Sequence, residues 1–299
     1  MRQIRPRLKI FVTGATGHVG KHFLKQLDGH EVLCLSRSPA PSLQTANLRW
    51  VKGALQDCAL LTSALKEFEP DVAVHLAWQG LPNYSKDVCD ENVQISLDLL
   101  SELLKTSVKR IVVAGSGFEY GSEHGELFES SKTNPNSDYA KAKLNLFSEF
   151  NRSCSGANVE LVWSRIFCSF GPGKPDSSLL PIVYRAMVNK EVPLVKTPGG
   201  TQDFVFVEDV ASAIFKLATT KSVSGLFNIG SGCLTSVAQI VNLVSEFCDS
   251  DFRIENIEYL HGPWASIEKI KKVTGWEPRY TLEQGVTESL IELKRRRLV

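Results

Sequence analysis

The run from Lys9 to Gly20 constrains the fold of this chain more than any other stretch. It opens with apolar and β-branched residues typical of a buried strand and continues with glycines at positions 14, 17 and 20. This spacing predicts a strand, a tight turn and a helix. Gly14 suits the turn, Gly17 lets backbone approach a phosphate, and Gly20 lets the helix pack closely. Because the first N–H groups of a helix are unpaired, we expect this segment to bind the pyrophosphate of a dinucleotide.

Apolar runs alternate with helix-like stretches over roughly the first half of the chain. Leucines repeat at helical spacing in Asn92–Lys105, which predicts a helix there. Strands are predicted at Glu31–Leu35, Leu48–Val51, Asp71–Leu76 and Arg110–Ala114. Strand–helix alternation of this kind predicts an α/β fold, a doubly wound parallel sheet with helices on both faces. Ligands bind such sheets at the carboxyl ends of the strands.

The pattern changes near residue 170, where Gly171-Pro172-Gly173 marks a loop. We expect residues 1–170 to form the dinucleotide-binding domain. Residues 171–299 should form mostly a smaller, mixed α/β lobe for substrate, with some segments returning to the first domain. Further predicted elements are the helices Leu179–Val188, Ser236–Phe247 and Leu282–Arg296 and the strand Gly225–Ile229.

Composition excludes several classes of protein. The formal net charge of +1 gives no reason to expect nucleic acid or a membrane surface as a partner. The apolar run behind the basic start, Met1 to Lys9, is too short for a signal peptide. The seven cysteines are scattered without a CxxC pair, which favours reduced thiols in the cytoplasm. The histidines show no metal-ligand spacing, so no metal site is predicted.

Tyr139 and Lys143 are four residues apart, so a helix would place them on one face. An ammonium beside a phenol favours the phenolate, and we expect Lys143 to lower the pKa of Tyr139 and make it an acid/base catalyst. Ser116 follows the apolar run Ile111–Ala114 and should lie at the carboxyl end of a parallel strand. Its hydroxyl could there hydrogen-bond a substrate oxygen.

These features together resemble the extended short-chain dehydrogenase/reductase family, in particular its nucleotide-sugar epimerases, dehydratases and reductases. The resemblance spans essentially the whole chain. It rests on Thr13–Gly20, Val74-His75-Leu76-Ala77, Asn92, Ser116 with Tyr120-Gly121, Tyr139/Lys143, Arg165, Gly171-Pro172-Gly173, Asp203–Val210, Asn228-Ile229-Gly230 and Gly275-Trp276-Glu277-Pro278. It implies a Rossmann-type fold in which Tyr139 is the acid/base, Lys143 holds the nicotinamide ribose and Ser116 orients the reacting oxygen.

The expected site residues follow from the turn, the strand ends and this resemblance. Cofactor contacts are expected from Gly14, Thr16, Gly17, His18, Val19, Gly20, Ser36, Arg37, Ser38, Leu55, Leu76, Ala77, Trp78, Asn92, Ala114, Tyr139, Lys143 and Ile166. Substrate contacts are expected from Ser116, Gly117, Phe118, Tyr139, Cys168 and Gln202.

Two details bear on the reaction. Dehydratases of this family carry Asp and Glu where this chain has Gly117 and Phe118, which argues against a 4,6-dehydratase. The loop after the second strand contains Arg37 and no acid, which favours NADP(H) over NAD(H). A dissociable NADPH suits net reduction, so the first hypothesis is a reductase of the 4-keto group of a nucleotide-activated deoxyhexose.

Three alternatives stay open. The first is a nucleotide-sugar 4-epimerase with tightly bound NAD, and the second is a non-catalytic dinucleotide-binding sensor. The third is a reductase whose carbonyl substrate carries no nucleotide. It arises because Gln202 stands where relatives often carry an arginine that binds the phosphates of the sugar nucleotide.

Some positions depart from the family pattern. Trp78 replaces a small residue and should narrow the pocket beside the cofactor, and Cys168 stands where many relatives have asparagine. Asn92 either shapes the water network of the active site or caps the leucine-rich helix that it opens. That helix either packs on the sheet or also forms a homodimer through the two long helices of the first domain, as in relatives.

Overall fold

The computed structural model describes residues 7–38, 47–255 and 261–297, so the basic start of the chain through Pro6 lies outside the described residues. The chain folds into two compact units. The first comprises Met1–Ser122, Thr133–Arg165 and Ala211–Phe227, and the second comprises Glu123–Lys132, Ile166–Val210 and Asn228–Val299. Each unit is described by itself below.

A seven-stranded sheet forms the framework of the first unit. Its strands are β1 (Lys9–Thr13), β2 (Glu31–Ser36), β3 (Leu48–Lys52), β4 (Val72–His75), β5 (Arg110–Ser116), β7 (Glu160–Ile166) and β11 (Gly225–Ile229). Their spatial order is β11-β7-β5-β4-β1-β2-β3. The pairings β1–β2, β2–β3, β1–β4 and β4–β5 are parallel. The strand order reverses between β1 and β4, the place where doubly wound sheets bind their ligands.

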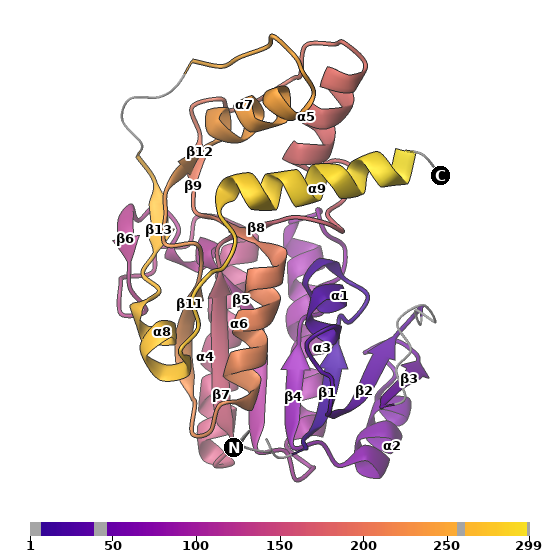
Figure 1. Cartoon of the computed structure of the whole chain (residues 1–299). Coiled ribbons are helices and arrows are strands. Elements are labelled where there is room, and N and C mark those ends of the chain that lie inside the picture. Colours follow the sequence, from indigo (N-terminus) through magenta and orange to yellow (C-terminus); the bar gives the residue numbers. More distant parts are fainter. Residues whose placement is uncertain (1–6, 39–46, 256–260, 298–299) are drawn as a thin grey trace, which may run out of the picture. The chain divides into compact units, whose positions relative to one another are not determined.

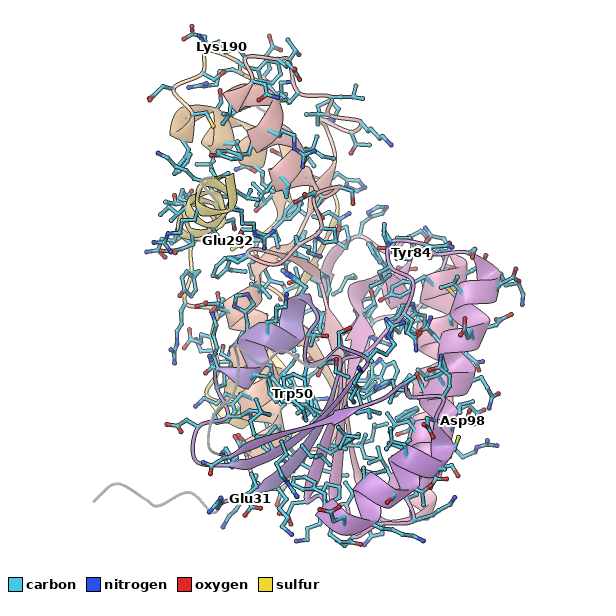
Figure 2. The ribbon with its side chains drawn as sticks, turned by 90° about the vertical axis from the view of Figure 1, so that its right-hand side faces the viewer. Glu31, Trp50, Tyr84, Asp98, Lys190 and Glu292 are labelled. Atoms are coloured by element: carbon cyan, nitrogen blue, oxygen red, sulfur yellow. The ribbon has the colours of Figure 1, made fainter. Side chains whose placement is uncertain are left out.

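Helices cover both faces of this sheet, which confirms the predicted α/β fold (Figure 1). In both views α1 and α6 lie on one face, and α3 and α4 lie on the other (Figure 2). The helices are α1 (His18–Leu24), α2 (Cys58–Phe68), α3 (Lys86–Leu103), α4 (Asp138–Gly156) and α6 (Val207–Thr219), with the short 3₁₀ helix η2 (Gly117–Tyr120) after β5.

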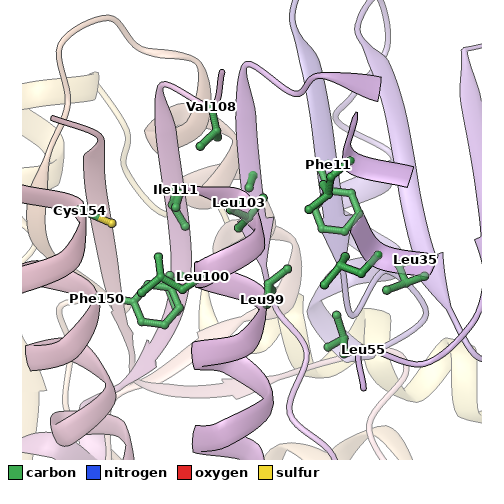
Figure 3. Packing of buried hydrophobic residues seen from close by; sticks show 14 of the residues in the cluster. Phe11, Leu35, Leu55, Leu99, Leu100, Leu103, Val108, Ile111, Phe150 and Cys154 are labelled. Atoms are coloured by element: carbon green, nitrogen blue, oxygen red, sulfur yellow. The ribbon is translucent and has the colours of Figure 1, made fainter. Parts of the chain in front are cut away.

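The core on the α3 side is one cluster of apolar side chains (Figure 3). Phe11 of β1 and Ile111 of β5 contribute from the sheet, and Leu99 of α3 and Phe150 of α4 contribute from the helices. All four are at most 1% exposed. Burying a side chain of this size contributes about 2 kcal/mol each, so this cluster fixes the helices on the sheet.

Helix α3 begins at Lys86, six residues before the predicted start. Its first turns carry charged residues in place of leucines, including the (i, i+4) ion pair of Lys86 with Asp90, so the apolar repeat does not reveal them. The interpretation of Asn92 as the opening residue of the helix was therefore wrong. Helices α3 and α4 pack against each other within the chain, and their pairing with a second copy stays a prediction.

The second unit combines short strand pairs with helices. Its strands are β6 (Gly125–Leu127), β8 (Cys168–Phe170), β9 (Thr201–Gln202), β10 (Phe204–Phe206), β12 (Thr235–Ser236) and β13 (Pro263–Ala265). They pair as β8–β10, β9–β12 and β6–β13. Its helices are α5 (Leu179–Val188), α7 (Val237–Phe247), α8 (Glu268–Thr274) and α9 (Leu282–Arg297), and α5, α7 and α9 pack on one another.

Within the described ranges, no helix has the length and apolarity that crossing a membrane requires. The same residues contain no group of three or more His, Cys, Asp or Glu side chains arranged to hold a metal ion.

Candidate active site

The glycine turn after β1 adopts the predicted geometry. Gly14 has φ +72°, and the N–H of Gly17 donates to its carbonyl oxygen over 2.9 Å. A Cβ at Gly14 would lie 2.6 Å from the backbone nitrogen of Ala77, in the loop after β4. One at Gly20 would lie 2.1 Å from the Gly14 oxygen. The turn therefore requires glycine at Gly14 for both its conformation and its packing.

The start of α1 is suited to an anion. Its N-cap, Gly17, provides no side-chain cap, and the first turn contains no acidic residue. Because the first N–H groups of a helix lack partners within the helix, they are donors that a phosphate would satisfy. Thr16, His18 and Val19 are half-buried beside it, so the residues present fit a pyrophosphate.

We expect Gly14→Ala to destabilise the chain by about 3 kcal/mol, of which the positive φ alone accounts for about 1 kcal/mol. Gly29→Ala is the matched control, because Gly29 has φ +83° but a Cβ added there would have no atom within 4 Å. Urea unfolding of both variants measures the difference. Equal decreases in the free energy of unfolding of the two variants would contradict the close approach of the Ala77 backbone to Gly14.

A buried polar chain ties the turn to the neighbouring elements. The Thr13 hydroxyl lies 2.7 Å from Nδ1 of His75, and Nε2 of His75 lies 3.0 Å from the Ser96 hydroxyl, which donates to the Asn92 carbonyl. Burial, with the nearby Lys143 charge, lowers the pKa of His75 to about 3. His75 is therefore a neutral link between β1, β4 and α3 and no acid/base catalyst near neutral pH.

Asn92 lies inside α3 and holds the loop after β4. Its side-chain oxygen accepts from the backbone N–H of Gln79 over 2.7 Å, and its Nδ2 donates to the carbonyls of Gln79 and Val88. The side chain therefore fixes the segment containing Leu76, Ala77 and Trp78.

Several other expected cofactor residues lie at the end of β2 and after β3. Arg37 is exposed after β2 and donates weakly to Gln79 over 3.4 Å. The Ser36 hydroxyl donates to the Ser38 carbonyl over 3.0 Å. Leu55, which was expected to contact the cofactor, belongs to the buried core cluster. An apolar residue suits either role, so the sequence alone could not separate core packing from a cofactor contact.

Ser116, Tyr139 and Lys143 come together at the carboxyl end of β5. Ser116 is the last residue of that strand, and Tyr139 and Lys143 lie in the first two turns of α4. The Ser116 side chain hydrogen-bonds the Tyr139 phenol. The Lys143 ammonium donates to the Ala114 carbonyl over 2.8 Å and lies 5.9 Å from the centre of the Tyr139 ring. The predicted helical face for Tyr139 and Lys143 is therefore present.

The expected lowering of the Tyr139 pKa does not occur in this structure. Burial raises that pKa, and it outweighs the opposing hydrogen bond from Ser116. Burial also lowers the pKa of Lys143 to about 8, because its ammonium has little contact with water. The prediction was wrong because it counted the charge of Lys143 and omitted the cost of burying both groups.

Glu119 is a site residue that sequence reasoning missed. Its carboxylate is fully buried and accepts from the Ser116 backbone N–H over 2.8 Å and from Nε1 of Trp163 over 2.9 Å. Its second oxygen accepts from Nε of Arg165 over 2.8 Å. The Arg165 guanidinium also lies 4.4 Å from the centre of the Tyr120 ring. This buried group fixes the backbone that presents Ser116.

A signal for it was present in the sequence. Glu119 follows the apolar strand in a segment of small and aromatic residues. Arg165 is the last residue but one of β7, which is otherwise mostly apolar. Two isolated opposite charges in buried segments indicate an ion pair, because neither is tolerated alone.

Three aromatic rings surround Tyr139, and we call them the aromatic collar: Trp78, Tyr84 and Phe118. Their ring centres lie 5.2, 5.2 and 6.5 Å from that of Tyr139, each in an edge-to-face arrangement. Tyr84 and Phe118 are 48% and 54% exposed, and Figure 2 places Tyr84 on the α3 side of the sheet. The collar thus offers exposed apolar surface next to the phenol.

The expected substrate residues Cys168 and Gln202, and Ile166, belong to the second unit. Cys168 begins β8, and burial raises the pKa of its thiol to about 11, so it is a neutral group and no nucleophile. It lines a cavity of about 140 Å³ together with Phe170, Lys174 and Phe204. Burial lowers the pKa of Lys174. Gln202 is half-buried and ends β9.

Comparison with known proteins agrees with this arrangement. The model of the NAD dependent epimerase/dehydratase family matches residues 10–230. The chain is 25% identical to a UDP-glucose 4-epimerase of Halalkalibacterium halodurans, with 94% of each chain covered. The solved structure of MoeE5 with UDP-glucose and NAD is 26% identical, with a TM-score of 0.82 over 97% of this chain and 100% of that one.

The epimerase Mth375 from Methanothermobacter thermautotrophicus has the same fold, with a TM-score of 0.86, 22% identity, and 98% and 94% of the two chains covered. The matched range contains the glycine turn, Ser116, Tyr139 and Lys143. The chain belongs to the NAD-dependent epimerase/dehydratase family of enzymes that act on nucleotide sugars.

Proposed function

We propose that this chain is a nucleotide-sugar 4-epimerase that uses NAD. The observation that carries the proposal is the meeting of Ser116, Tyr139 and Lys143 at the carboxyl end of β5, with Ser116 hydrogen-bonded to the phenol. The similarity to a UDP-glucose 4-epimerase and to MoeE5, whose structure holds UDP-glucose and NAD, supports epimerisation over net reduction.

The residues for the cofactor are those of the glycine turn and the strand ends. Gly14, Gly17 and the first N–H groups of α1 would hold the pyrophosphate, and Tyr139 with Lys143 would hold the ribose of the nicotinamide. When bound, NAD takes up a hydride from the substrate carbon and returns it, and its oxidised ring adds a positive charge.

The chain's own residues move the proton. In its phenolate form, which the positive charges of Lys143 and the bound cofactor would favour, Tyr139 would remove the proton from the C4 hydroxyl of the hexose as the C4 hydrogen leaves as hydride, which would give a 4-keto sugar and a neutral phenol. Ser116 would hydrogen-bond the same oxygen throughout. Tyr139 would then return the proton to the ketone oxygen as the hydride comes back to the other face of the ring, which would invert C4. The reaction has no net oxidation, so no external reductant is consumed.

Two measurements on the purified chain test this function. Denaturation should release NAD, and incubation with UDP-galactose without added cofactor should form UDP-glucose, both followed by chromatography. Release of NADP, or no sugar interconversion with NAD supplied, would contradict the proposal.

A second candidate is the NADPH-dependent reductase of a nucleotide-activated 4-keto-deoxyhexose. The observation that favours it is Arg37, exposed directly after β2 in a loop where Arg accommodates a 2′-phosphate.

If Arg37 binds a 2′-phosphate, Arg37→Ala should weaken NADPH binding about 10- to 100-fold and leave NADH binding unchanged, because one charge-assisted contact is lost. Calorimetry with both cofactors on nucleotide-free protein measures this. Arg49→Ala, an exposed arginine on the neighbouring strand, is the control. Equal, small effects on both cofactors would remove this support for the reductase.

A further inference from the structure

The Lys143 ammonium lies against an aromatic face, with no carboxylate bonded to it among the described residues. Its Nζ lies 4.0 Å from the centre of the Trp78 ring and donates to the Ala114 carbonyl over 2.8 Å. The residue is only 4% exposed. A buried ammonium needs compensation, and a tryptophan face within about 6 Å supplies it through the ring quadrupole.

The other ionisable groups around Lys143 do not replace this contact. Glu119 on η2 raises the pKa of Lys143 through space, but both its oxygens are already bonded. Cys89 on α3 has a raised pKa and is a neutral thiol near pH 7. His75 at the end of β4 is neutral, and Tyr139 on α4 is a neutral phenol because burial raises its pKa. The face of Trp78 is therefore the nearest direct partner for the charge apart from the Ala114 carbonyl.

Trp78 itself is fixed from three sides. Ala77, the preceding residue, packs against the Gly14 turn, and Gln79, the following residue, is held by Asn92. The ring also meets Tyr139 edge to face at 5.2 Å. Its indole N–H is buried and has no partner among the described residues. Trp78 therefore contacts its neighbours through its ring and not through its N–H, and it lies between the glycine turn and α4.

We infer that Trp78 is a positioning residue that holds the ammonium of Lys143 on its indole face and keeps it charged beside Tyr139. The catalytic value of this role rests on the proposed function, because that function gives Lys143 its part in catalysis. The contact between Trp78 and Lys143 does not depend on the proposed function. Trp78 thereby helps this chain to keep Lys143 charged.

The test is the pKa of Lys143 in nucleotide-free protein, measured by NMR on ¹³C,¹⁵N-lysine with Lys143→Met to assign the signal. The ammonium is lost as the pH rises through its pKa of about 8. Trp78→Leu removes the ring but keeps the site apolar, so this pKa should fall by about one unit. Trp78→Phe keeps a weaker aromatic face and should give a smaller decrease. The basic limb of the kcat profile should move to lower pH in the same order.

Trp50→Leu is the matched control, because Trp50 is also half-buried with an unpartnered indole N–H but is far along the sheet in β3. It should leave the Lys143 pKa unchanged. An unchanged or higher pKa in Trp78→Leu would overturn the inference, and Trp78→Phe decides the matter if the leucine variant fails to fold. Because NMR needs no turnover, a chain without epimerase activity but with the expected shifts would refute the proposed function and retain the inference.

Discussion

Replacing Tyr139 by phenylalanine should lower kcat about 10³-fold, within the range of 10²- to 10⁴-fold that a positioned acid/base supplies. The change removes only the hydroxyl. Phenylalanine keeps the edge-to-face contacts with Trp78, Tyr84 and Phe118. Thermal unfolding should therefore stay close to that of the parent chain while the rate of sugar interconversion falls.

Tyr84→Phe provides the control for this experiment. The Tyr84 ring meets that of Tyr139 edge to face, and the substitution removes the same hydroxyl from this neighbouring ring. It should retain kcat within about tenfold, since Tyr84 has no assigned proton to transfer. Equal activity of Tyr139→Phe and the parent chain would remove Tyr139 from the mechanism.

The Glu119→Ala variant should lose about 3–5 kcal/mol of its free energy of unfolding, the usual cost of breaking a buried ion pair. Glu119 is fully buried and its partner Arg165 is 2% exposed. Without the carboxylate, the guanidinium is left as an uncompensated buried charge. The backbone N–H of Ser116 and Nε1 of Trp163 also lose their acceptor. Urea unfolding measures the loss.

Two further variants separate the charge from the packing. Glu67→Ala removes the carboxylate of an exposed pair with Arg49, in which Glu67 is 75% exposed, and should cost less than about 1 kcal/mol. Combining Glu119→Gln with Arg165→Met removes both charges and should recover much of the loss. A Glu119→Ala variant as stable as Glu67→Ala would show that the buried pair contributes nothing to the fold.

Local patterns predicted the framework of the site well. The glycine spacing predicted the turn at Gly14, and the apolar run before it predicted β1. The offset between Tyr139 and Lys143 predicted their shared helical face. These features follow from neighbouring residues and the periods of helix and strand, so a single sequence contains them.

Contacts between distant segments were not predictable in this way. Glu119 and Arg165 are 46 positions apart, and Lys143 meets Trp78 over 65 positions. The direction of the Tyr139 pKa depended on burial, which residue offsets do not report. The start of α3 was missed for another reason, because its charged first turns interrupt the leucine repeat.

The measurement that tests the central claim most directly is the fate of the C4 hydrogen. UDP-galactose in D₂O, with the purified chain and no added reductant, should become UDP-glucose with the C4 proton retained in the ¹H NMR spectrum. Retention follows because the hydride returns to the carbon it left, while Tyr139 exchanges only the hydroxyl proton. Absence of interconversion, together with NADPH consumption on a 4-keto nucleotide sugar, would contradict the epimerase and establish the reductase.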